Sequence, residues 1–255
     1  MNSVVVFFRI TGGLLSLLME TLYWCKASFS NSDKVFAQLY IIGNQTLPVG
    51  ALIALFSGGV LALQAGPTLA QFGLEENVGG LVGLSLVKEI GPIMASILIA
   101  GRVGSAMTAE LASMSVYEEI DALKTMDINP VRYLVMPRFI AMVLALPILV
   151  IYMDVIGWFG GGIVSVINPE VHLSFDVYYR NLSELVDFTA VMNGLIKAMF
   201  FGIIISIVCC YVGLKTKGGP REIGSSVTKA VVMSFVLVLV SDYYITRILL
   251  FLNLD

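Results

Sequence analysis

Long apolar runs dominate the sequence, and five of them are long enough to cross a bilayer as helices, which takes about 20 residues each. They span about residues 47–63, 79–106, 139–166, 191–214 and 227–252. The connections between them are too short to hold a soluble domain. The pattern therefore predicts an all-α membrane protein with a five-helix membrane domain over residues 46–255.

The first 45 residues (1–45) form a separate N-terminal region. Residues 4–24 are apolar but too interrupted by charges, and too poor in N-terminal basic residues, for a signal peptide. We expect a helix lying along the membrane surface, with its basic side chains in water: Arg9, Lys26 and Lys34. An additional spanning helix is the alternative.

Composition agrees with a surface that faces lipid. Hydrophobic residues make up 58% of the chain and charged residues 13%, with a mean hydropathy of +0.91, whereas a soluble domain carries about 25% charged residues. The net charge of −3 gives no support for a nucleic-acid partner. The three cysteines and the single histidine, His172, lack the spacing of a metal site, so no metal is expected.

Basic residues are unevenly distributed among the connections. Those of the second and fourth connections are Lys124, Arg132, Arg138, Lys215, Lys217, Arg221 and Lys229. Between residues 64 and 78 there is none, and between residues 168 and 190 there is only Arg180. Because basic loops stay in the cytoplasm, the N-terminus is predicted to be cytoplasmic and the C-terminus periplasmic.

A short amphipathic helix is predicted in the second connection, at about residues 115–128. Ser115 and Glu118 have the spacing of a capping box, and Asn129 with Pro130 would end the element. The residues that define its acidic first turns and its apolar face are Glu118, Glu119, Asp121, Ile120, Leu123 and Met126. An acidic helix is poorly suited to an anionic membrane surface. It is better explained as a docking element for a protein partner than as a plain connector.

Two sequence blocks carry a family resemblance. Residues 101–110 read GRVGSAMTAE, and residues 118–123 read EEIDAL, followed by Asn129-Pro130. Upstream, residues 84–92 read LSLVKEIGP. From about residue 47 to the C-terminus the chain resembles the MlaE-type permease family of ABC lipid transporters, which includes plastid lipid-import permeases.

The resemblance implies a non-catalytic subunit that moves phospholipids between membranes and works as a homodimer of permeases. The short helix would couple to ABC ATPase subunits, which would bind ATP and Mg²⁺, and an MCE-domain protein would bind on the far side. The implied location is a cell inner membrane, with an organelle envelope as the alternative. The chain has no G-x-x-x-x-G-K-[ST] motif, so ATP would have to be bound by another subunit.

Ionisable residues inside spanning helices cost about 2.5–3.5 kcal/mol each on insertion scales, and they are therefore functional candidates. Five are prominent: Lys88, Glu89, Arg102, Lys197 and Asp242. Counted from the outer helix ends, Lys88, Lys197 and Asp242 lie about 13, 10 and 15 Å deep at 1.5 Å per residue. They could form one layer in which the lysines bind an anionic head group. The alternative is a self-contained set of ion pairs.

Other candidates have different expected roles. Gly101, Gly104, Ser105, Thr108 and Ala112 form a small-residue stripe that permits close helix packing. Arg102, Glu110 and Pro130 are read as structural, with Arg102 and Glu110 bracing the short helix. The resemblance makes four apolar residues candidates for acyl-chain contact, although a lipid-facing or packing role is the better explanation for any single one of them: Leu61, Leu63, Leu69 and Phe72.

Two other functions remain open. An ion-coupled secondary transporter could use Lys88, Glu89 and Asp242 as a relay and would need no ATPase. An intramembrane lipid-modifying enzyme would need a catalytic constellation of a kind that this sequence does not offer.

Overall fold

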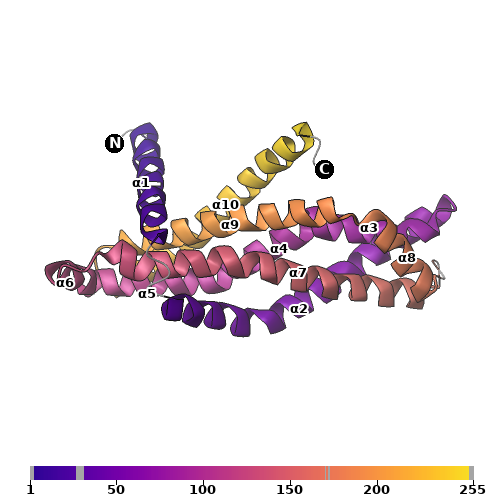
Figure 1. Ribbon diagram of the computed structural model, residues 1–255, viewed down its shortest axis with the longest axis horizontal. Helices are drawn as coiled ribbons and strands as arrows, with labels where there is room; N and C mark the ends of the chain where they lie inside the picture. Colours follow the sequence, from indigo (N-terminus) through magenta and orange to yellow (C-terminus); the bar gives the residue numbers. More distant parts are fainter. Residues whose placement is uncertain (1–2, 27–31, 170, 172, 253–255) are drawn as a thin grey trace. The chain divides into compact units, whose positions relative to one another are not determined.

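The computed structural model describes residues 3–26, 32–169, 171 and 173–252; His172 lies outside this part of the chain. Within it, all regular secondary structure is helical (Figure 1). The elements are α1 Ser3–Cys25, α2 Ser32–Gln71, η2 Glu75–Asn77, α3 Val78–Ser85, η3 Leu86–Ile90, α4 Gly91–Ile99, η4 Ala100–Gly104, α5 Ser105–Val116, α6 Glu119–Thr125, η5 Val131–Val135, α7 Met136–Ile167, α8 Phe175–Leu185, α9 Phe188–Leu214 and α10 Pro220–Phe251. The all-α prediction is confirmed.

Five helical segments of the described chain are long and apolar enough to span a membrane, as predicted. They are Thr46–Gln71, Glu75–Val116, Val131–Ile167, Phe188–Leu214 and Pro220–Phe251. Most run several residues beyond the predicted limits, because the helices continue into the polar flanks. The chain is thus a multi-pass membrane protein. The placement of α1 on the membrane surface stays a prediction.

The second span is interrupted by two π-turns, η3 and η4, and a third, η5, opens the next span. Pro92 lies just after η3 and has no backbone N–H, so it cannot complete a regular α-helical ladder there. Such π-turns are rare and occur frequently at functional sites. Of the residues singled out above, Lys88 and Glu89 lie in η3 and Arg102 lies in η4.

The chain divides into two compact units. The first comprises Met1–Gly43, Ile97–Ala145 and Phe200–Val240. Here α5 packs closely on α9, since a Cβ added to Gly104 would lie 2.8 Å from Sγ of Cys209. The Thr108 hydroxyl donates to the Gly104 carbonyl at 2.8 Å and lies 3.3 Å from that of Cys209. The predicted small-residue contact is therefore present at Gly104 and Thr108.

The second unit comprises Asn44–Ser96, Leu146–Met199 and Ser241–Asp255. Within it, α8 lies beside α3 (Figure 1), and the buried side chains of Val78, Val82 and Tyr178 form part of one core cluster. Helix α8 was not predicted from the sequence. Its start is capped by Ser174, whose hydroxyl accepts a hydrogen bond from the Val177 backbone N–H.

The predicted capping box at Ser115 is wrong. Ser115 belongs to the last turn of α5, and its hydroxyl reaches the carbonyls of Leu214 and Thr216, at 3.3 and 2.8 Å. Helix α6 starts only at Glu119 and ends at Thr125, so it is shorter than the predicted 115–128. The residue before it, Glu118, has a left-handed backbone with φ 61° and makes no side-chain cap. The hydroxyl satisfies a neighbouring helix end instead of its own.

Close contact between α2 and α7 depends on glycine. A Cβ at Gly58 would collide with the Gly157 carbonyl. We expect Gly58→Ala to lower the free energy of unfolding by about 1–3 kcal/mol through overpacking. Gly43→Ala in the same helix is the control, because its added Cβ has no neighbour within 4 Å; it should be neutral or slightly stabilising. Thermal unfolding in detergent measures both, and equal behaviour of the two variants would contradict the packing argument.

A candidate substrate-path charge cluster and a cytoplasmic helix

Three of the predicted intramembrane charges meet at one ammonium group. Lys197 Nζ lies 2.7 Å from Glu89 Oε1, 2.9 Å from the Lys88 carbonyl oxygen and 3.3 Å from Asp242 Oδ1. The Lys197 side chain is only 3% exposed, while that of Asp242 is 15% and that of Glu89 is 40% exposed. A lysine has three N–H donors. Two of the donors of Lys197 are taken up by Glu89 and by the Lys88 carbonyl, and Asp242 is held as an ion pair.

The chain's own sequence explains why the ammonium lies here. In an α-helix the N–H of residue 92 would bond to the Lys88 carbonyl, but Pro92 has no N–H. Lys197 supplies the missing donor. Gly194, one turn earlier in α9, makes the approach possible, because a Cβ there would collide with the Val87 carbonyl.

The two carboxylates are held differently. Glu89 Oε1 accepts from Lys197 and lies 3.3 Å from the Thr246 hydroxyl, whose shorter bond of 2.9 Å goes to the Asp242 carbonyl. Asp242 Oδ1 is close enough to Lys197 for an ion pair, but it is buried without a well-directed hydrogen bond. The more exposed Glu89 is thus tightly bonded, and the more buried Asp242 relies on charge attraction.

The four candidate acyl-chain residues divide into two pairs. Leu61 and Leu69 pack against the buried core cluster of the second unit. Leu63 and Phe72 are exposed. Leu63 also lines an apolar groove of about 320 Å³ between α2 and α7, with Leu55, Phe56, Gly59, Val60, Gly160, Ile163 and Val164.

Helix α6 presents most of its side chains outward. Of the predicted docking residues, Glu118, Glu119, Asp121 and Met126 are exposed, and Leu123 is half-buried. Ile120 is buried and anchors the helix. Asp121 accepts a hydrogen bond from Lys124 at 2.7 Å, and this bond lowers the pKa of the Asp121 carboxyl.

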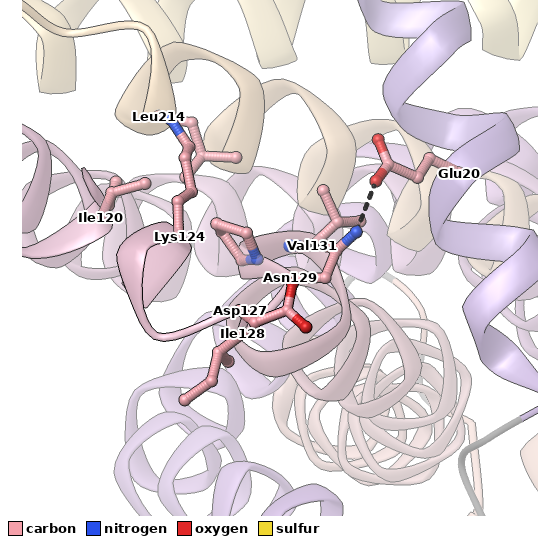
Figure 2. A pocket seen from close by; sticks show the side chains of 9 residues that line it. Glu20, Ile120, Lys124, Asp127, Ile128, Asn129, Val131 and Leu214 are labelled. Atoms are coloured by element: carbon pink, nitrogen blue, oxygen red, sulfur yellow. Dashed lines mark hydrogen bonds between the residues drawn. The ribbon is translucent and has the colours of Figure 1, made fainter. Parts of the chain in front are cut away.

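A cavity of about 500 Å³ opens beside α6 (Figure 2). Side chains from three places in the sequence line it: Glu20, Ile120, Lys124, Asp127, Ile128, Asn129, Pro130, Val131 and Leu214. Figure 2 shows Glu20 of α1 and Asn129 pointing toward each other, joined by a hydrogen bond of 3.2 Å. Helix α1 is therefore tied to the segment that follows α6.

Asn129 and Pro130 start the next helix rather than only ending the previous one. The Asn129 side-chain oxygen accepts from the backbone N–H groups of Val131 and Arg132, at 2.8 and 3.2 Å. Pro130 has the fixed φ that suits a first helical position. These bonds couple the end of α6 to η5 and α7.

Arg102 and Glu110, which were both predicted to be structural, have different surroundings. Glu110 pairs with the buried Arg138, with 2.6 Å between Oε1 and Nη2. Arg102 is exposed, and none of the ion pairs found in the described part of the chain includes it.

Sequence reasoning missed several residues that the structure makes prominent. Thr246 and Arg138 complete the contacts described above. Asp154 is buried in the third span. It is the one acidic or basic residue of the stretch 139–166, so the rule that flagged the other intramembrane charges could have found it.

Comparison with known proteins shows to which family the chain belongs. The family model of the permease MlaE matches residues 35–248. The chain belongs to the MlaE permease family. It is 33% identical over 250 residues to the intermembrane phospholipid transport system permease protein MlaE of Haemophilus influenzae, covering 97% of this chain and 95% of that protein.

Two other relatives widen the range. A probable ABC transporter permease protein of Rickettsia typhi is 41% identical over 215 residues, covering 84% of this chain and 82% of the relative. The chloroplastic protein TRIGALACTOSYLDIACYLGLYCEROL 1 of Arabidopsis thaliana is 34% identical over 211 residues, covering 82% of this chain and 59% of that protein. The permease therefore has relatives in bacteria and in a plant.

Removing the shared ammonium should destabilise the permease. Lys197→Met leaves Glu89 and Asp242 without their cation, and breaking a buried pair costs about 3–5 kcal/mol. The triple variant Lys197→Met, Glu89→Gln, Asp242→Asn removes all three charges and should recover much of the loss. Thermal unfolding in detergent is the measurement, with the exposed Lys229→Met as the control. Wild-type stability of Lys197→Met would show that the cluster contributes little.

Proposed function

We propose that this chain is the transmembrane permease of an ATP-driven ABC transporter that moves phospholipids between membranes. A separate subunit hydrolyses the ATP. The observation that carries the proposal, together with family membership, is the exposed acidic helix α6, anchored by the buried Ile120 between two membrane spans. An acidic surface of this kind suits a basic groove on a protein better than it suits the membrane surface.

Helix α6 can transmit motion because both of its ends are connected. Its start follows α5 of the second span, and its end leads through Asn129 and Pro130 into η5. Glu20 adds α1 to the same connection. A partner that pulls on α6 would therefore act on α1 and on two spanning segments at once.

The charge cluster is the proposed contact for the lipid head group. Lys88, Glu89, Lys197 and Asp242 carry two positive and two negative charges, and Lys197 is already held by both carboxylates. We assign Lys197 to holding the cluster together. Lys88, which is partly exposed, is the basic residue that meets an anionic phosphate, as a point charge. Leu63 and Phe72, with exposed side chains, would contact acyl chains.

Further features of the proposal are two permease copies, ABC ATPases on the cytoplasmic face and an MCE-domain protein on the far side, in an inner membrane. Basic residues concentrate in the connections that follow the second and fourth spans, and the connections after the first and third spans have few. This alternation along the chain supports the orientation with a cytoplasmic N-terminus. The name of the Haemophilus relative supports phospholipid as the substrate.

The ion-coupled alternative is less favoured. A relay through Glu89 and Asp242 would need carboxylates that can exchange ions, whereas both are paired with the same buried ammonium. Co-purification of a nucleotide-binding subunit with the tagged chain separates the two functions.

Charge reversal on α6 tests the coupling. The double variant Glu118→Lys, Glu119→Lys should lose co-purification of the ATPase, because it turns an acidic docking surface basic. The matched control is Glu184→Lys, Asp187→Lys, which reverses two exposed acids around the end of α8. Pull-down of the ATPase from solubilised membranes is the readout. Retention of the ATPase by the α6 variant would refute the docking role.

Lys88 can be tested for head-group contact through transport. Lys88→Met should lower ATP-dependent phospholipid transfer between vesicles by about tenfold or more, on the basis of one hydrogen bond to a charged group. Lys88→Arg keeps the charge and should retain most of the transfer. ATPase co-purification should be unchanged in both variants. Undiminished transfer by Lys88→Met would remove this residue from the substrate path.

A further inference from the structure

Asp154 is a buried carboxyl group that neither the substrate path nor the docking helix uses. It lies in α7 and is 5% exposed. Its Oδ1 is buried without a hydrogen-bond partner, and none of the ion pairs in the described part of the chain includes it. Buried polar groups nearly always have a partner, so one without requires an explanation.

The carboxyl group borders a very small cavity of about 10 Å³. The residues that line it are Ala54, Ser57, Leu86, Ile90, Gly91, Met94, Met153 and Asp154. From α2, η3, α4 and α7 they bring one further polar side chain, the Ser57 hydroxyl, and no other titratable or charged group. The nearest charges along η3, Lys88 and Glu89, are not part of the lining, and Glu89 is paired with Lys197.

The cavity size decides which ligands are possible. About 10 Å³ is the space of a single water molecule, so a hydrated ion or a lipid head group does not fit. Metal binding needs several ligands, and the described residues hold no group of three or more histidine, cysteine or acidic side chains placed so that it could hold a metal ion. The ligands that remain are a proton and one water molecule.

The energetics favour the same ligand. An ionised carboxylate in this position has given up most of its hydration, it gains no cation in return, and its Oδ1 gains no hydrogen bond. A neutral carboxylic acid avoids most of that penalty and gains an O–H donor. One water can then bridge the carboxyl group and the Ser57 hydroxyl.

Gly91 places this carboxyl group at the end of the π-turn. A Cβ on Gly91 would collide with Asp154 Oδ1, so the oxygen lies directly against the backbone there. The Gly91 N–H is also the group that closes η3, by donating to the Leu86 carbonyl. The same five-residue turn carries Lys88 and Glu89.

We propose that Asp154 is a proton-binding site whose neutral carboxyl group, bridged by one water to Ser57, fills the space between α7 and the π-turn η3. Ionisation of this group requires more hydration than a cavity of this size supplies. The site is separate from the Lys197 cluster, and its existence does not depend on the proposed function.

Infrared difference spectroscopy of the purified chain in phospholipid nanodiscs tests the site directly. At neutral pH, the difference between wild type and Asp154→Asn should contain the carbonyl stretch of one neutral carboxylic acid, shifted in heavy water. The control is Asp176→Asn, which removes an exposed aspartate paired with Arg180 and should show carboxylate bands alone. A difference for Asp154→Asn with only carboxylate bands would overturn the proposal.

Two further variants keep the test decisive. Asp154→Glu retains the proton carrier, so the neutral-acid band should shift rather than vanish, which provides the readout if Asp154→Asn does not insert. Ser57→Ala removes the bridged hydroxyl, and the band should move to higher frequency as its hydrogen bond weakens. An unmoved band in Ser57→Ala would refute the water bridge.

The consequence for transport has its own readout, which rests on the proposed function. If the neutral form is the working form, wild-type lipid transfer should fall at alkaline pH as Asp154 ionises, and Asp154→Asn should resist that fall. The same pH dependence of transfer in both proteins would show that ionisation of Asp154 does not affect transport. Failure of the proposed function would instead abolish ATP-dependent transfer at every pH and leave the infrared result unchanged.

Discussion

The structure depends on one constraint: inside a bilayer, backbone polar groups and charges must be satisfied within the protein. Pro92 breaks the hydrogen-bond ladder of the second span, and the Lys197 ammonium reaches the carbonyl that this leaves over. Once that ammonium is buried, it needs counter-charges, which Glu89 and Asp242 provide. The ammonium that reaches this carbonyl therefore also holds the two carboxylates. The cluster has as many positive as negative charges when Lys88 is included, which keeps its insertion cost acceptable.

The same constraint gives different results elsewhere. Glu110 and Arg138 form a single ion pair, in which the arginine is buried and the glutamate is exposed. No ion pair in the described part of the chain includes Asp154, and protonation neutralises its carboxylate with the smallest free-energy cost. The second unit therefore holds two kinds of intramembrane acid. One kind is compensated by lysine, and the other, in our account, is compensated by protonation. Glu89 belongs to the π-turn η3, and Asp154 Oδ1 lies against Gly91 at the end of the same turn.

Much of the fold could be predicted from the sequence because the signals were long. Five spans of about 20 apolar residues are hard to mistake, and the small-residue stripe at Gly104 and Thr108 indicated a close contact that the structure contains. Short-range signals were less reliable. Ser115 had the spacing of a helix cap, yet its hydroxyl bonds to the end of α9, because a tertiary partner was closer than its own helix start. Helix α8 was missed, since its eleven residues are too polar to resemble a span.

The candidate site was predictable only as a list of residues. Intramembrane charge flagged Lys88, Glu89, Lys197 and Asp242, but sequence could not say which of them pair, because that depends on where Pro92 and Gly194 bring two helices together. The pairing of Glu110 with Arg138 was likewise out of reach, as the two residues lie in different spans. Asp154 was overlooked although the same rule applied to it.

The central claim is that this permease is the lipid-binding subunit of a transporter complex whose ATPase is a separate chain. Native mass spectrometry of the complex, purified from its own membranes through a tag on this chain, tests that claim most directly. The account predicts two copies of the permease, nucleotide-binding subunits and bound phospholipid in one assembly. Detection of the permease without any partner, or only with partners that bind no nucleotide, would contradict it.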